Sequence, residues 1–200
     1  LFAQKRKTIF NILAGVSMGA AILSKWLPAL IVLPIWLLIV LDSEKFKPKE
    51  IFLQFIILLT TSIVIFLPWQ LYIFKEFPLE ASWEASFNFK HITEVLDERT
   101  GPFYYYIDRI RINYGELIYL PLIWFLWKSF KNLHDKKRLA VSIWAVIPLI
   151  FFSIAKTKMQ AYILFISPAL FLMTADFFYM LNDYKKKHKP KWLFNLVLFL

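Results

Sequence analysis

FFSIAKTKMQAYILFISPAL (Phe151–Leu170) consists of two apolar runs that meet around a pair of lysines, Lys156 and Lys158. A charged side chain inside a bilayer is costly unless it reaches the interface or meets an opposite charge. The stretch therefore predicts two membrane-spanning helices joined by a short turn that carries two cations. We expect something anionic to meet these cations.

The composition of the whole chain is typical of an integral membrane protein. Of its 200 residues, 59% are hydrophobic and 19% are aromatic, whereas soluble domains are about half apolar. There is no cysteine, which excludes a disulfide and a thiolate metal site. The net charge of +10 fits loops near anionic lipid head groups, so we expect membrane lipid and no nucleic acid as a partner.

The chain is predicted to be all-α, a piece of a single multi-pass transmembrane domain with about seven spans. The predicted spans are residues 9–24, 27–41, 51–74, 114–127, 139–155, 159–181 and 192–200, the last of which is cut by the end of the sequence. Lys25 is the one charge between the first two spans, so we expect the chain to turn there. Gly15 and Gly19 form a GxxxG pattern, which predicts close packing between helices of the same chain.

The longest segment between predicted spans, residues 75–113, is rich in aromatic side chains and is not of low complexity. Such a segment is expected to fold onto the membrane surface rather than to be disordered. Acidic and aromatic residues recur at helical spacing from Glu80 to His91, which predicts a short interfacial helix. A second short helix is expected over residues 102–111.

The basic residues are distributed unevenly between the two sides of the membrane. When the spans alternate, 16 of the 24 lysines and arginines fall on one side, in residues 1–8, 42–50, 128–138 and 182–191. Basic loops stay on the cytoplasmic side. The chain is therefore predicted to lie in the cytoplasmic (inner) membrane with the 75–113 loop extracytoplasmic.

Lys25, Lys156 and Lys158 lie in short turns on the side that this rule makes non-cytoplasmic. One interpretation is that they reach the lipid head groups by extending their long side chains. The alternative is that helix packing brings them to one site at the outer interface, where their ammonium groups bind the phosphate of a lipid. In that alternative we expect Lys158 to contribute most.

Four stretches, in one order along the chain, resemble the GT-C membrane glycosyltransferases, the group that includes aminoarabinose transferases and protein O-mannosyltransferases. They are GVSMGAAILSKWLPALIVLPIWLLI (15–39), FLPWQLYI (66–73), RTGPFYYYI (99–107) and FSIAKTKMQAYILFISPAL (152–170). Trp26 stands where the family pattern has glycine, Met159–Gln160 where it has Leu-Pro, and Phe165 where it has proline.

The resemblance implies an inverting transferase that takes a sugar from a polyprenyl phosphate at the outer face of the membrane. Lys25, Lys156, Lys158 and Tyr162 would then belong to the site for the donor lipid phosphate. A second set, which would contact the sugar or the prenyl chain, consists of Arg99, Tyr104, Tyr105 and Tyr106. The family's catalytic carboxylate lies in an upstream loop, so no catalytic residue is expected here. The chain is expected to be inactive without a missing N-terminal part.

Two alternatives accompany these expectations. His91 and Glu84 are weak candidates for metal ligands, because one histidine with nearby acids also describes a solvated helix face. No cofactor is indicated, although some family members hold a metal near this loop, so a divalent metal in the full-length protein stays open. A non-enzymatic lipid transporter or flippase component could use the same lysines, but it would place ionisable groups at mid-membrane. A scaffold without either activity is the third alternative.

The predicted side of the 75–113 loop can be tested by labelling, because the chain contains no cysteine. A cysteine introduced by Ser86→Cys should react with a membrane-impermeant maleimide in intact cells. Labelling that requires permeabilised cells would reverse the whole topology.

Overall fold

The computed structural model describes residues 1–43 and 46–188, and within these ranges it contains helices and turns without strands. The helices are α1 Phe2–Lys5, α2 Thr8–Ala29, α3 Val32–Asp42, α4 Pro48–Glu76, α5 Pro78–Thr93, α6 Tyr105–Tyr114, η1 Glu116–Ile118, α7 Tyr119–Lys131, α8 Lys136–Ile154, η2 Gln160–Ile166 and α9 Ser167–His188. Four helical segments of the described part are long and apolar enough to cross a membrane, namely Thr8–Lys25, Pro48–Glu76, Lys136–Ile154 and Gln160–Lys186. The all-α, multi-pass prediction is confirmed, and the seventh predicted span (192–200) lies outside the described residues.

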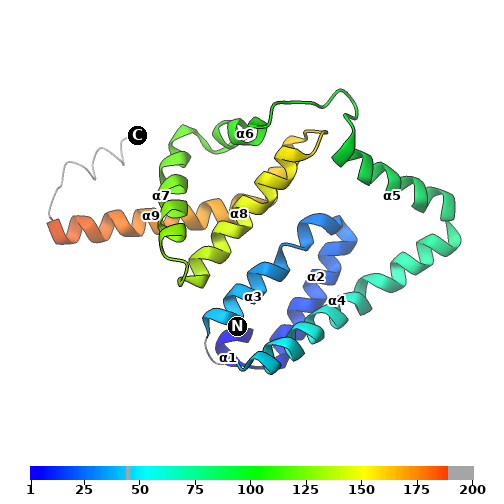
Figure 1. Cartoon of the computed structure of the whole chain (residues 1–200), viewed down its shortest axis with the longest axis horizontal. Coiled ribbons are helices and arrows are strands. Elements are labelled where there is room, and N and C mark those ends of the chain that lie inside the picture. The colour runs from blue at the N-terminus through cyan, green and yellow to red at the C-terminus, as the bar shows by residue number, and fades with distance from the viewer. Residues whose placement is uncertain (44–45, 189–200) are drawn as a thin grey trace.

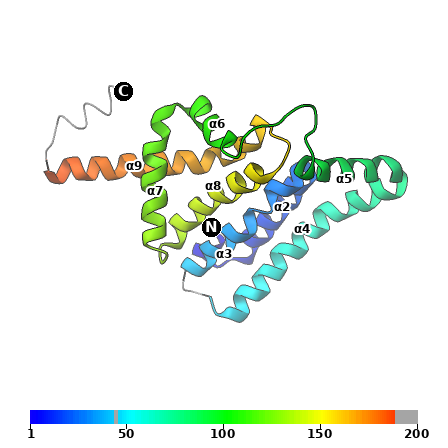
Figure 2. The same ribbon diagram turned by 45° about the horizontal axis from the view of Figure 1, so that its top comes forward.

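The helices form two groups, as Figures 1 and 2 both show. In the first group, α2 and α3 pack with α4. In the second, α7, α8 and α9 pack together beneath α6. The groups meet where α3 packs against α8, and an ion pair of 3.0 Å between Lys137 and Asp42 joins these two helices. α5 leads from the far end of α4 back toward the second group (Figure 1).

Helices α2 and α4 approach closely because α2 presents two glycines to α4. A Cβ atom on Gly15 would lie 2.8 Å from the carbonyl oxygen of Leu58, and one on Gly19 would lie 2.7 Å from the Cβ of Ile65. Any larger side chain would force the helices apart. The GxxxG pattern thus serves packing within the chain, as predicted.

A buried polar network fastens the first group. Asn11 on α2 is fully buried, and its Nδ2 donates hydrogen bonds to the carbonyl oxygen of Gln54 (2.6 Å) and to the side-chain Oε1 of Gln54 (3.1 Å). The indole Nε1 of Trp36 on α3 donates to Oδ1 of Asn11 at 2.8 Å. Because buried polar groups must be paired, this network specifies how the three helices align.

The predicted turn at Lys25 is present, but the helix that follows it begins later than expected. Lys25 has non-helical backbone angles (φ −162°, ψ 89°) that kink α2. A further helical turn containing Pro28 ends at Ala29, and α3 then begins at Val32 rather than at residue 27. The amide of Ile31 donates to the carbonyl of Pro28 at 3.3 Å, which closes this intervening turn. α3 is consequently only 11 residues long.

The segment from residue 75 to residue 127 differs most from its prediction. α5 confirms the expected helix near Glu80–His91, and α4 continues as a helix through Pro68 to Glu76. The second short helix, α6, begins at Tyr105 rather than at residue 102.

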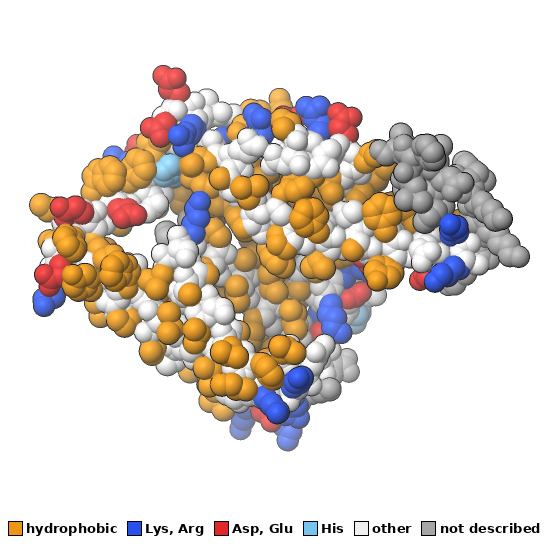
Figure 3. Space-filling view, turned by 180° about the vertical axis from the view of Figure 1, so that it is seen from behind, with side chains coloured by type: hydrophobic (Ala, Val, Ile, Leu, Met, Phe, Trp, Pro, Cys, Tyr) orange, Lys and Arg blue, Asp and Glu red, His pale blue; other side chains and the backbone are white. Residues whose placement is uncertain are grey.

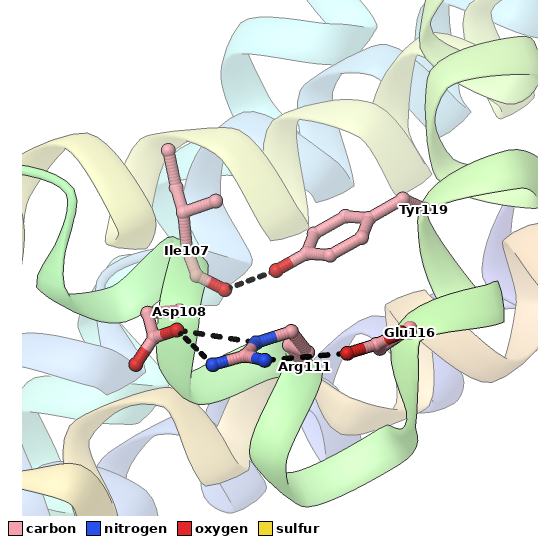
Figure 4. Close-up of polar contacts among 5 residues, drawn as sticks. All are labelled: Ile107, Asp108, Arg111, Glu116 and Tyr119. Atoms are coloured by element: carbon pink, nitrogen blue, oxygen red, sulfur yellow. Dashed lines mark hydrogen bonds and ion pairs between the residues drawn. The ribbon is translucent and has the colours of Figure 1, made fainter.

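The helix expected over residues 114–127 begins instead at Tyr119. Gly115 has a φ of +83°, which glycine adopts without strain and which ends α6. The guanidinium of Arg111 pairs with Asp108 (2.8 Å) and Glu116 (3.2 Å), and the hydroxyl of Tyr119 donates to the carbonyl of Ile107 (Figure 4). These contacts make a corner between α6 and α7 and hold Glu116 outside the helix.

The second group has its own apolar core and a charged end. Its fully buried side chains come from α6, η2 and α9, and include Tyr106, Ile163, Ile166, Leu170 and Met173. At the end of α8 opposite the Lys156–Lys158 turn, Arg138 donates to Asp176 of α9 at 2.6 Å. The span predicted over 159–181 is a 3₁₀-helix, η2, followed by α9.

Many large hydrophobic side chains are exposed on the outer surface of the molecule. Figure 3 shows one face on which they extend across the middle, whereas lysine, arginine, aspartate and glutamate gather mainly at its margins. Exposed Phe52, Leu53 and Val64 on α4 illustrate the pattern, with 67%, 58% and 63% of their surfaces accessible. An apolar belt of this kind fits a surface in contact with lipid.

We predict that Gly19→Val destabilises the protein by about 1–3 kcal/mol, because overpacking forces α2 and α4 apart. Thermal unfolding of the purified protein in detergent measures the effect. Ala20→Val, one residue along on the exposed side of α2, is the matched control and should change stability by less than about 0.5 kcal/mol. Equal effects of the two variants would contradict the packing role of Gly19.

Candidate functional site

An apolar groove lies where the two groups of helices meet. Its volume is about 210 Å³, and its wall is made by the α2–α3 connection on one side and by α8 and η2 on the other. The lining residues are Pro28, Leu30, Ile31, Pro34, Ile147, Pro148, Phe151, Phe152 and Phe165. Such a lining suits a hydrocarbon chain.

A smaller cavity of about 80 Å³ adjoins this groove, because Pro28, Phe151 and Phe152 line both. In contrast to the groove, it contains polar groups. Its other lining residues are Lys25, Asn88, His91, Ile92, Ala155 and Tyr162. We call it the polar cavity.

The side chains of the polar cavity contact one another. The hydroxyl of Tyr162 lies 3.3 Å from Nδ1 of His91, and the ammonium of Lys25 lies 5.3 Å from the centre of the Tyr162 ring. The ring of Phe152, which also lines the cavity, stacks on that of Tyr162 with 4.5 Å between the ring centres. Lys25 lies at the kink of α2, and its ammonium reaches the Tyr162 ring of the second group. An apolar groove that ends at a lysine matches an amphiphile with an anionic head.

The turn Ala155–Met159 holds the wall of the polar cavity in place. Successive backbone amides of Lys156, Thr157 and Lys158 donate to the carbonyls of Ile92 (3.0 Å), His91 (3.1 Å) and Arg99 (2.7 Å). The amide of Met159 donates to the hydroxyl of Tyr106 at 3.1 Å. The turn therefore joins α8, the end of α5 and α6.

The structure gives Lys158 partners different from the predicted lipid phosphate. Only 6% of its surface is accessible, and its ammonium donates to the carbonyls of Phe152 (3.0 Å), Ser153 (2.5 Å) and Ala155 (2.7 Å). An ammonium has three donors, so all are used. Burial and the nearby charge of Lys156 lower the pKa of Lys158, while the three carbonyls favour its charged form. Lys158 thus caps the C-terminal end of α8.

The other two lysines of the predicted site are accessible. Lys25 lines the polar cavity, whereas Lys156 does not line it, although its backbone amide is bonded to Ile92 of the cavity wall. Both side chains are exposed. The expectation that all three lysines converge on one site is therefore corrected. Lys25 lies in the cavity, Lys156 lies beside it, and Lys158 lies behind its wall.

The three tyrosines of the predicted sugar or prenyl contact lie in different surroundings. Tyr104 is exposed, with 63% of its surface accessible, whereas Tyr106 is fully buried in the core. Burial raises the pKa of Tyr106 to about 12, and its hydroxyl accepts from Met159. Tyr105 packs beneath the guanidinium of Arg109 at 4.8 Å. Tyr106 consequently serves packing and is not placed to contact a ligand.

Arg99 lies beside the Ala155–Met159 turn, since its carbonyl accepts from the amide of Lys158 at 2.7 Å. Its guanidinium is about half exposed and is 4.0 Å from Asp97. Arg99 does not line the polar cavity.

Within the part of the chain that the structure describes, no three histidine, aspartate, glutamate or cysteine residues come together to hold a metal. His91 instead contacts Tyr162 and the edge of Phe87, whose ring centre is 4.9 Å away. Glu84 is exposed on α5 beside Trp83, away from the polar cavity. The described residues of this chain alone do not form a complete metal site.

Sequence reasoning missed two contributors to the site. Asn88 lines the polar cavity without any pattern that marks it. The groove is lined by Phe151, Phe152 and Phe165, which the sequence pattern marks only as parts of apolar spans. Their position beside the Lys156–Lys158 turn is the one signal that could have identified them.

Comparison with known proteins confirms the class that the four sequence stretches resemble, the GT-C membrane glycosyltransferases. No protein-family model matches the chain. Its fold matches the crystal structure of ArnT from Cupriavidus metallidurans bound to undecaprenyl phosphate, with a TM-score of 0.57 and 22% identity over 82% of this chain and 29% of that one.

Within this class, the chain is related to the aminoarabinose transferases. It is 32% identical over 170 residues, or 82% of its length, to the undecaprenyl phosphate-alpha-4-amino-4-deoxy-L-arabinose arabinosyl transferase of Yersinia pestis (strain Pestoides F). It is 32% identical over 158 residues to the transferase of the same name from Enterobacter sp. (strain 638). The chain spans 30% and 28% of these relatives.

We predict that Lys158→Met destabilises the protein by about 1–3 kcal/mol, because buried carbonyls of α8 lose their donor. Lys158→Arg should not restore stability, since a planar guanidinium does not fit an enclosure shaped for three carbonyl contacts. Thermal unfolding in detergent measures both, with Lys156→Met as the control in the same turn. Wild-type stability of Lys158→Met would contradict the cap, because methionine donates no hydrogen bond to these carbonyls.

Proposed function

We propose that the full-length protein is an inverting glycosyltransferase that moves a sugar from a polyprenyl phosphate to an acceptor. The observation that carries the proposal is the apolar groove that ends at the polar cavity with Lys25 and Tyr162. The names of the relatives and the undecaprenyl phosphate bound to the ArnT neighbour support it.

In this proposal the groove holds the prenyl chain and the polar cavity holds the phosphate. The volume of about 210 Å³ accommodates only part of a long chain, so the remainder extends among the apolar spans. The phosphate lies beside the ammonium of Lys25, with the Tyr162 hydroxyl as a hydrogen-bond donor. Arg99 approaches from the loop side, and Lys156 reaches the head group from its exposed position.

These cations act on the leaving group of the reaction. As the bond between the sugar and the phosphate breaks, negative charge grows on the phosphate oxygens. A cation fixed beside them stabilises the transition state more than the ground state, which lowers the barrier. At an effective dielectric constant of ~20, an ammonium ~4 Å from a unit negative charge interacts by roughly 4 kcal/mol before desolvation is subtracted.

We assign no general base to this chain. The proposed reaction needs a carboxylate that activates the acceptor on the face of the sugar opposite the phosphate. Two carboxylates of the loop that follows His91, Glu94 and Asp97, are exposed, and Asp97 faces Arg99. The base would come from another part of the full-length protein.

We place the polar cavity at the outer face of the cytoplasmic membrane. The support is the distribution of basic residues, with 16 of 24 on the side opposite the 75–113 segment. Lys25 and Tyr162 lie near the ends of the membrane-length segments Thr8–Lys25 and Gln160–Lys186, and His91 lies on α5, outside such a segment. This arrangement favours an interfacial enzyme over the alternative of a lipid transporter.

We predict that Lys25→Ala lowers turnover of the polyprenyl-phosphate sugar by ~5- to 150-fold in the full-length enzyme in vesicles, equivalent to a loss of about 1–3 kcal/mol. Lys25 replaces Lys158 as the lysine of greatest expected effect, because its ammonium lines the cavity. Lys156→Ala should have a smaller effect.

Lys90→Ala is the matched control, since Lys90 is an exposed lysine of α5 next to His91 and does not line the cavity. It should retain wild-type turnover. Wild-type turnover of Lys25→Ala and of the Lys25→Ala/Lys156→Ala double variant would refute the phosphate site and leave the lysines in contact with lipid head groups.

A further inference from the structure

Thr157, in the turn after α8, forms hydrogen bonds with both its side chain and its backbone to the end of α5 and the loop that follows it. Its side chain is fully buried. Its Oγ1 donates to the carbonyl of Glu94 at 2.8 Å and accepts from the amide of Leu96 at 3.0 Å. Its backbone amide donates to the carbonyl of His91 at 3.1 Å. One residue thus bonds the end of α5 and the first half of the loop.

The loop Glu94–Arg99 depends on these bonds for its conformation. Asp97 and Glu98 have φ angles of 51° and 56°, a left-handed conformation that residues other than glycine seldom adopt. Consecutive residues keep such angles only when their surroundings impose them. The amide of neighbouring Thr100 donates to the carbonyl of Glu98 at 2.9 Å. The hydrogen bonds that join the loop to a part of the chain distant in sequence come from Thr157 and Lys158.

The loop matters to the polar cavity because of what its two ends carry. Its first end continues from His91, which lines the cavity and contacts Tyr162. Its last residue, Arg99, is held at the Ala155–Met159 turn, because its carbonyl accepts from the amide of Lys158 at 2.7 Å. A loop released from Thr157 would therefore loosen the end of α5 and change the position of His91, while Lys25 and Tyr162 stay in place.

We infer that Thr157 is a positioning residue, whose hydroxyl latches the Glu94–Arg99 loop and thereby holds His91, at the end of α5, in the wall of the polar cavity. The inference rests on the proposed function for the ligand of the cavity, but the latch itself is a property of the fold. A hydroxyl is needed because the same atom both donates and accepts. Valine keeps the shape of threonine without either capacity, and serine keeps both.

The test compares Thr157→Val with Thr157→Ser in the full-length enzyme in lipid nanodiscs. Hydrogen–deuterium exchange of the peptide covering residues 94–99 should accelerate by ~10-fold in Thr157→Val, because the Leu96 amide loses its acceptor. The KM for the lipid donor should rise by ~10-fold, with kcat changed less than ~3-fold, because the position of His91 in the cavity wall is altered rather than the chemistry. Thr157→Ser should restore both values.

Ser142→Ala is the control for loss of a buried hydroxyl, since Ser142 of α8 is buried and bonds Ser129 of α7 at 2.8 Å. It should leave exchange in residues 94–99 unchanged. Unchanged loop exchange in Thr157→Val overturns the latch, and faster exchange with an unchanged KM overturns the positioning role. If the wild-type enzyme turned over no polyprenyl-phosphate sugar, the proposed function would fail, and loop exchange alone would still decide whether the latch exists.

Discussion

The ammonium group of Lys158 is the contact on which the arrangement of the second helix group depends. A helix leaves its last carbonyls without partners, and Phe152, Ser153 and Ala155 at the end of α8 are buried. Lys158 supplies one cation with three donors to these carbonyls. The turn that follows is fixed as a result, and its amides are directed at the loop and at Tyr106. The position of Tyr162 follows from the same turn, because η2 begins at Gln160.

The candidate site exists because two groups of helices, each packed around its own core, leave a space between them where they meet. The first group is closely packed because of the glycines of α2 and the Asn11 network. The second group is closely packed around its aromatic and aliphatic core. Between them, prolines on both sides contribute rigid, apolar walls that do not interlock, which leaves the groove. The kink at Lys25 then places a cation at the end of this space.

The sequence was sufficient to predict features that depend on residues close together in the chain. Long uncharged runs indicated the spanning helices, Gly15 and Gly19 indicated a close approach, and the lone Lys25 indicated a turn. It was insufficient for features that depend on backbone angles or on contacts between residues far apart in the sequence. Hydropathy could not show that Gly115 would adopt a positive φ and separate α6 from α7. Nor could it show that the cation of Lys158 would face main-chain carbonyls, because every residue has a carbonyl and no side-chain pattern marks these.

The shortness of α3 has a consequence for the membrane around the groove. Eleven residues rise about 16 Å along a helix, against ~30 Å for the hydrocarbon core. Neighbouring α4, with 29 residues, is long enough for the full thickness. Hydrophobic mismatch of this kind is relieved by a local thinning of the bilayer or by tilting of the longer helix. Since Pro34 of α3 lines the groove, thinning around α3 would bring the head group of a lipid beside the groove nearer to the membrane midplane than elsewhere.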